Sequence, residues 1–275
     1  MEPITFKQCF KGAWIDGFNA LRSRPLLCVS VAVVILVSSA LGISLKQLSQ
    51  AAAQNGDTAG YRFNLALTSL GVAFVNTVAV AILSVHVLRY VVLGPEAARQ
   101  APWMGRDVWR YLWLTLQIVI GGVIVGFVPA FLIGLALGLA KSTNALALMA
   151  TFLVLVACAV IFIGVRVSLI YGQIAAGRSK RWRAAWQDSR GHFWSMFGTA
   201  LAAILPLFAV GLVLTLLLGL TIKLMPDVTV AVLGSLMLKT VFTVVWVAVG
   251  CGVAGWLYHR YAHQLLDLEG APDDV

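Results

Sequence analysis

Long runs of apolar residues dominate the chain. They cover residues 25–45, 63–93, 111–140, 145–172, 196–222 and 228–261. A helix needs roughly 20 apolar residues to cross a hydrocarbon core about 30 Å thick, and every run reaches that length. The runs are continuous and do not alternate between apolar and polar positions, which argues against a transmembrane barrel. The pattern therefore predicts an all-α polytopic membrane protein with six transmembrane helices arranged as three hairpins.

The composition and the placement of charge extend this picture. Of the 275 residues, 60% are hydrophobic and only 11% are charged, against roughly 25% charged residues in an ordinary soluble domain. The net charge is +9, and 15 of the 20 Lys and Arg residues fall on one side of the predicted spans. Basic residues concentrate in cytoplasmic loops. We therefore expect a bacterial inner-membrane protein with both termini in the cytoplasm.

The N-terminal segment and the cysteines each add one expectation. Residues 1–24 contain Glu2, Trp14 and Asp16 and lead into a full-length apolar run, which is unlike a cleaved signal peptide. The four cysteines are not at metal-ligand spacing, so the sequence predicts neither a zinc site nor a disulfide framework.

A segment that mixes basic residues with Trp precedes the first, third and fifth runs. The three segments read "FKQCFKGAWIDGFNALRSR", "GPEAARQAPWMGRDVWRYLW" and "GRSKRWRAAWQDSRGHFW". The chain is therefore interpreted as one membrane domain, residues 1–265, built from units 1–94, 95–176 and 177–265. Each unit is a cytoplasmic amphipathic segment followed by a hairpin, and the units are parallel repeats. Residues 266–275 are expected to form an acidic disordered tail.

The third segment predicts a helix that lies in the membrane interface. At 100° per residue, its aromatic and small residues share one face and its polar residues share the other. The first face holds Trp182, Ala185, Trp186, Ser189 and Phe193, and the second holds Lys180, Arg183, Gln187 and Arg190. Trp favours the headgroup level, and basic side chains beside anionic lipid contribute about 1 kcal/mol each. A short loop tied to two spans does not fit nucleic-acid binding.

The same region carries a family resemblance. An Arg near the end of the fourth predicted helix, Arg166, is followed by a pattern of aromatic, hydroxyl, basic and Gly residues. This pattern comprises Trp186, Ser189, Arg190, Gly191, Phe193 and Trp194. It resembles the signature region of bacterial YciC-like six-span membrane proteins and of the similar membrane domain of glycerophosphoryl diester phosphodiesterases. The sequence departs from that signature at Gly172 and Gln173, where a Pro-containing turn is expected. The resemblance implies the six-span fold more than a function.

Arg166 is the most informative charge, because every Asp and Glu lies outside the predicted spans. The lack of intramembrane carboxylates counts against a proton-coupled carrier and an aspartyl membrane protease. Arg166 either holds a phosphate or anionic headgroup, or extends to the cytoplasmic surface from roughly 9 Å below it. The candidate headgroup residues are Arg166, Arg183, Arg190, Trp182 and Trp186.

Other polar residues in or near the spans are interpreted as structural. We expect His86, Asn76 and Gln117 to form interhelical hydrogen bonds worth about 0.6 kcal/mol each. His259 and His263 lie at i and i+4, a spacing that fits a metal site, but tyrosines beside them favour an interfacial belt.

Small residues recur every four positions in the third run and predict close helix packing. They are Gly122, Gly126, Ala130, Gly134 and Gly138. The ridge packs either within the chain or at the contact between subunits of a homo-oligomer. Pro129 in the same run predicts a kink.

These observations favour a non-enzymatic membrane protein that engages anionic phospholipid or supports membrane homeostasis. Asp188, Ser189 and His192 lie within five residues, but no Gly-x-Ser-x-Gly elbow surrounds the serine, so no catalytic triad is expected. No cofactor motif is present. The alternatives are a transporter or channel for a small solute or lipid, and an accessory or immunity-type membrane partner protein.

Overall fold

Helices account for almost all of the computed structural model, which describes residues 4–56, 58–139, 145–224, 228–263 and 265. In order they are α1 (Phe6–Ser23), α2 (Pro25–Gln54), α3 (Ala59–Leu93), α4 (Pro95–Gln100), α5 (Arg106–Leu139), α6 (Ala145–Ala175), α7 (Trp182–Asp188), α8 (Phe193–Leu224) and α9 (Val228–Tyr261). No strand occurs among these residues, and six helices are long and apolar enough to cross a membrane. The all-α prediction is therefore confirmed, and the chain is a multi-pass membrane protein.

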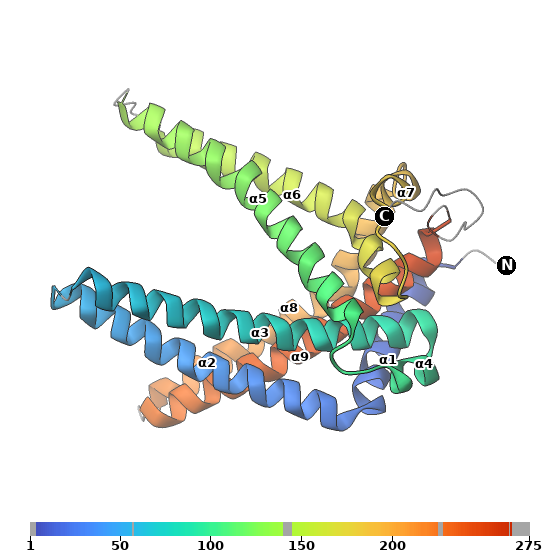
Figure 1. The fold of residues 1–275 in the computed structure, drawn as a ribbon, viewed down its shortest axis with the longest axis horizontal. Helices are drawn as coiled ribbons and strands as arrows, with labels where there is room; N and C mark the ends of the chain where they lie inside the picture. Colours follow the sequence, from blue (N-terminus) through green and yellow to red (C-terminus); the bar gives the residue numbers. More distant parts are fainter. Residues whose placement is uncertain (1–3, 57, 140–144, 225–227, 264, 266–275) are drawn as a thin grey trace.

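The six long helices lie side by side in consecutive pairs, α2 with α3, α5 with α6 and α8 with α9 (Figure 1). Helices α1, α4 and α7 gather with the C-terminal end of α9 at one end of the molecule, and the C-terminal ends of α2, α5 and α8 point away from it (Figure 1). We call this end the α7 end. The predicted acidic tail, residues 266–275, lies outside the described residues.

Several helices differ in length from the apolar runs. Helix α2 continues to Gln54 instead of ending at residue 45, because the segment that follows the apolar run is rich in the helix formers Lys, Gln and Ala. The second predicted surface segment is divided, since only Pro95–Gln100 forms α4 and Arg106 already begins α5. Asp107 lies in the first turn of α5, where a carboxylate stabilises the positive end of the helix dipole.

Helix α1 begins with a capping box and packs on other helices. Thr5 accepts a hydrogen bond from the Gln8 backbone N–H, while the Gln8 side chain accepts one from the backbone N–H of Thr5. Pro25 at the first position of α2 separates the two helices. The buried face of α1 consists of Cys9, Ala13, Gly17 and Ala20. The first predicted surface segment is therefore partly a core helix.

Helix α9 is at the centre of the packing, in contact with α1, α2, α3, α6 and α8. Its crossing with α1 brings backbone against backbone. A Cβ atom built on Gly252 would lie 2.5 Å from the carbonyl oxygen of Ala13, and one built on Gly17 would lie 2.8 Å from that of Ala248. The Trp256 indole donates a hydrogen bond to Asp16 at 2.9 Å beside this crossing.

The α5–α6 pair touches the other helices only near the α7 end. The described residues of α5 that are buried are Val108 and Leu114, and those of α6 lie between 167 and 175. Beyond them the most apolar 18-residue stretch of each helix is 0% buried within the protein, as expected for surfaces in contact with lipid.

The α1–α9 crossing generates a stability prediction. Gly252→Ala places its new methyl group against the Ala13 carbonyl and should destabilise the protein by about 1–3 kcal/mol, the usual cost of overpacking. Thermal unfolding in detergent measures this. Gly250→Ala is the matched control in the same helix, because a Cβ there would meet nothing within 4 Å. Equal stability of the two variants would contradict the tight crossing.

Candidate functional site

Two turns and one long-range hydrogen bond hold α7 over the end of α6. Gly177 after α6 has φ 78° and Gly191 before α8 has φ 82°, a left-handed conformation that other residues rarely adopt. Asp188 at the end of α7 is buried and accepts a hydrogen bond from the Leu265 backbone N–H at 3.0 Å. Ala185 is buried on the same side. The C-terminal chain thus fixes α7 against the helix bundle.

Arg166 of α6 lies between two aromatic rings. The centre of its guanidinium group is 4.6 Å from the Phe162 ring centroid and 4.3 Å from the Trp186 ring centroid. Phe162 is one helical turn before Arg166, whereas Trp186 comes from α7. Both distances are within the range for cation–π attraction. Docking of α7 therefore determines where the Arg166 side chain lies.

The Arg166 guanidinium has no hydrogen-bonding partner within the described part of the chain. Its Nε is buried and unpartnered, and the ion pairs found among these residues involve Arg89 and Arg110 with Asp107. A donor that is buried without a partner costs about 1–3 kcal/mol. The side chain is thus held in place by ring contacts while its hydrogen-bonding capacity is unused by the protein.

A cavity of about 440 Å³ lies beside Arg166, between α6 and α7. We call it the Arg166 groove. Its α6 wall is apolar apart from Arg166, with Ile163, Val167 and Ile170. The α7 wall comprises Trp182, Arg183, Ala185, Trp186 and Gln187. No Asp or Glu is among the lining residues, and the surface of the groove is mostly apolar.

The structure brings together four of the five candidate headgroup residues. Arg166, Arg183, Trp182 and Trp186 all line the groove, whereas Arg190 is exposed beyond the end of α7 and is not among the lining residues. Trp182, Arg183 and Trp186 all border this one cavity, while Ala185 and Ser189 of the predicted Trp face are buried.

Helix α7 is shorter than the segment that was projected from the sequence. Helix α7 ends at Asp188, and Phe193 already begins α8. The positive φ of Gly191 lies between the two helices. Lys180 precedes α7, and its Nζ donates a hydrogen bond to Gln117 at 3.4 Å.

The residues of the family-like pattern differ in burial and in the side chains that they contact. Ser189 is fully buried, and its hydroxyl donates to the Trp186 carbonyl at 3.1 Å. Phe193 lies against Phe162 at 5.0 Å between ring centroids, and Trp194 is 78% exposed. The Arg166 and Trp186 elements of the pattern, 20 residues apart in sequence, are in direct contact.

Phe162 is the site residue that sequence reasoning missed. It lies inside an apolar run, where an aromatic residue has no distinguishing feature. The signal that was available is its spacing, because residues four apart on a helix share a face.

The small-residue ridge of α5 packs partly against α6. A Cβ on Gly126 would lie 3.1 Å from Val156, and one on Gly134 would lie 3.0 Å from Met149. Gly122 faces open space, and Ala130 is partly buried. Gly138 belongs to α5, but its surroundings lie outside the described residues. These contacts support packing within the chain at two positions of the ridge.

Asn76 and His86 form interhelical hydrogen bonds, as predicted, whereas Gln117 bonds to Lys180 in the loop before α7. Asn76 accepts a hydrogen bond from Ser38 of α2 at 3.1 Å. The His86 Nε2 lies 3.1 Å from the Ala20 carbonyl and 3.2 Å from the Ser23 hydroxyl, both in α1.

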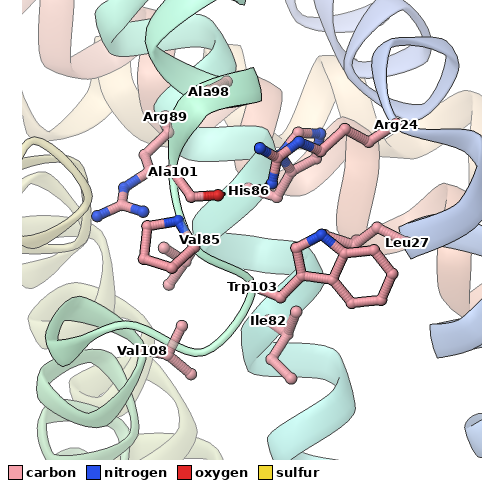
Figure 2. A pocket seen from close by; sticks show the side chains of 11 residues that line it. Arg24, Leu27, Ile82, Val85, His86, Arg89, Ala98, Ala101, Trp103 and Val108 are labelled. Atoms are coloured by element: carbon pink, nitrogen blue, oxygen red, sulfur yellow. Dashed lines mark hydrogen bonds between the residues drawn. The ribbon is translucent and has the colours of Figure 1, made fainter.

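A second, much smaller cavity adjoins His86, with walls from α2, α3, α4 and α5 (Figure 2). Arg24 donates to the Ala101 carbonyl at 2.8 Å there, and Arg89 donates to both Asp107 and the Ala175 carbonyl. Its volume of about 10 Å³ matches a single water molecule. Because its cations bond to protein oxygens, this cluster joins helices and offers little to a ligand.

The remaining candidates contact other helices or the C-terminal chain. Asp188 binds the Leu265 backbone, and the His192 ring lies 5.1 Å from that of Tyr261. The His259 Nε2 lies 3.0 Å from the Val91 carbonyl. No group of three potential metal ligands occurs among the residues described.

Comparisons with protein-family models, with curated proteins and with solved structures found no match to this chain. The resemblance to YciC-like six-span membrane proteins therefore remains a prediction.

The ring contacts of Arg166 generate a chemical prediction. In detergent, an arginine-selective dicarbonyl reagent should modify the exposed Arg190 well before Arg166, because the guanidinium of Arg166 is covered by Phe162 and Trp186. Trp186→Ala should accelerate modification of Arg166 and leave Arg190 unchanged. Peptide mass spectrometry measures both sites. Equal reaction of the two arginines in the unsubstituted protein would contradict the arrangement.

Proposed function

We propose that this membrane protein binds the headgroup of an anionic phospholipid in the Arg166 groove and acts without catalysing a reaction. The observation that carries the proposal is the Arg166 guanidinium, fixed between two rings, unpartnered within the described residues and open to a cavity of about 440 Å³. Arg forms paired, charge-assisted hydrogen bonds with phosphate oxygens.

The shape and surroundings of the groove support a lipid as the ligand. One wall is the apolar surface of α6, which continues along the helix into the region that contacts lipid. Exposed Trp side chains surround the same end of the molecule, where Trp favours the headgroup level. They are Trp103, Trp109, Trp113, Trp182, Trp186 and Trp194.

Preorganisation favours binding at Arg166 over binding at an exposed basic residue. A free Arg side chain loses rotamer freedom when it binds a phosphate, at a cost of about 0.5–1.5 kcal/mol. Contacts with Phe162 and Trp186 already restrict Arg166 in the absence of ligand. The groove therefore supports selective retention of lipid, a role consistent with membrane homeostasis.

The charge distribution supports an orientation in the bacterial inner membrane. The α7 end carries most of the Lys and Arg residues, and such an end is normally cytoplasmic. In this proposal both termini and the Arg166 groove face the cytoplasm, so the bound lipid belongs to the inner leaflet.

Native mass spectrometry of the protein extracted with its lipids tests the binding proposal. The unsubstituted protein should retain an anionic phospholipid, and Arg166→Ala should lower its occupancy by roughly tenfold or more, since a hydrogen bond to a charged group contributes about 1.5–3 kcal/mol. Arg190→Ala is the matched control, because it also removes one positive charge near α7 but lies outside the groove.

Thermal unfolding of both variants separates loss of lipid from loss of fold. Lipid retention that is equal in Arg166→Ala and the unsubstituted protein would refute the proposal. An equal loss in Arg190→Ala would assign retention to general surface charge and would refute the groove as its location.

Cysteine labelling in a cysteine-less background tests the orientation. A membrane-impermeant maleimide should label Asn55→Cys from outside intact spheroplasts, and it should label Arg190→Cys only after permeabilisation. Both positions are exposed in the structure. The reverse pattern would place the α7 end outside. Native Cys9 offers little background even if retained, since burial raises the pKa of its thiol and the reactive thiolate is then scarce.

A further inference from the structure

We propose that one acyl chain of the bound phospholipid occupies the Arg166 groove, while the phosphate of the same lipid is held at Arg166. This inference rests on the proposed function and adds the part of the lipid that fills the groove. The occupant is a hydrocarbon chain attached to an anionic headgroup, so the site recognises both parts of one molecule.

The surface of the groove suits a hydrocarbon chain. It is mostly apolar, and its lining residues include the aliphatic Ile163, Val167, Ile170 and Ala185. Water in such a groove would find few hydrogen-bonding partners, whereas an acyl chain has no hydrogen bonds to lose. The lining therefore favours a chain over water.

The groove is continuous with the surface of α6 that contacts lipid. Ile163 lines the groove and is itself exposed, and exposed apolar side chains continue from it along the helix through Phe162, Ile161 and Val160. The most apolar stretch of α6 is 0% buried within the protein. An acyl chain of a neighbouring lipid can therefore enter the groove without crossing a polar surface.

The other end of the groove lies against the helix bundle. Ile170 of α6 and Ala185 of α7 both line it and are buried. From Ile163 to Ile170 the groove follows about 10 Å of helix, and its volume of about 440 Å³ falls within the usual range for ligand sites, about 300–1,000 Å³. These dimensions accommodate a segment of one chain.

Arg166 accounts for the retention of an anionic lipid over other lipids. A chain that moves from the bilayer into the groove exchanges one apolar environment for another, so burial alone contributes little. Charge-assisted hydrogen bonds from the guanidinium to phosphate supply the attachment. The rings of Phe162 and Trp186 hold that guanidinium at 4.6 Å and 4.3 Å, and Trp186 also lines the groove.

Photo-crosslinking of the protein in nanodiscs locates the chain. The probe is phosphatidylglycerol that carries a diazirine within one acyl chain. After trypsin digestion, mass spectrometry should find the probe on peptides 167–178 and 184–190, which contain groove residues of α6 and α7. Peptide 100–106 is the control and should carry several times less label, because its exposed Trp103 lies outside the groove.

A larger side chain on the groove wall tests whether the space is used. Ile163→Trp should lower retention of phosphatidylglycerol by roughly fivefold or more, within the usual effect of overpacking. Ile161→Trp is the matched control and should retain the lipid normally, since Ile161 is 46% exposed against 42% for Ile163 but is not a lining residue. Native mass spectrometry measures retention, and thermal unfolding shows whether both variants fold.

The outcomes separate this inference from the proposed function. Labelling of peptide 184–190 no stronger than that of peptide 100–106, or equal retention by the two Ile variants, would overturn the chain site and leave headgroup binding at Arg166 intact. Displacement of the lipid by millimolar glycerophosphoglycerol, which has no acyl chain, would also overturn the chain site. Groove labelling and retention that are unchanged in Arg166→Ala would instead refute the proposed function, because the chain would then bind without the headgroup contact.

Discussion

The crossing of α1 over α9 is the contact on which the other arrangements depend. Its backbone-to-backbone approach at Gly17 and Gly252 leaves no room for a side chain, so it sets the distance between the N-terminal helix and the central helix. Helix α9 then contacts four further helices and leads at its end to Leu265, whose backbone N–H binds Asp188 of α7. Helix α7 in turn carries the Trp186 ring that covers Arg166. The position of the Arg166 groove therefore depends on the α1–α9 crossing.

Opposing energies of similar size act on Arg166. The two ring contacts stabilise the guanidinium by about 0.5–2 kcal/mol each, and the buried Nε without a partner costs about 1–3 kcal/mol. The side chain is therefore held in position at little net gain, and an anion that supplies acceptors would add to stability without first displacing a protein partner. The Arg24 and Arg89 cluster illustrates the opposite case, since protein carbonyls and Asp107 already occupy those donors.

The sequence predicted the features that depend on local pattern. Six apolar helices follow from hydrophobic run length, and the hydrogen bonds of Asn76 and His86 follow from the cost of isolated polar groups in spans. The prediction failed where tertiary contacts decide. Helical projection included residues from Lys180 to Phe193, but α7 is only Trp182–Asp188. Phe162 went unnoticed because its role depends on a ring brought from 24 residues further along the chain.

The most direct test of the central claim is a cryo-electron microscopy structure of the protein in nanodiscs that contain anionic phospholipid, with a bound antibody fragment to aid alignment. The account predicts Arg166 between the rings of Phe162 and Trp186, with headgroup density within hydrogen-bonding distance of its Nη atoms and of Arg183. An Arg166 side chain extended into water, away from Trp186 and without headgroup density beside it, would contradict the account.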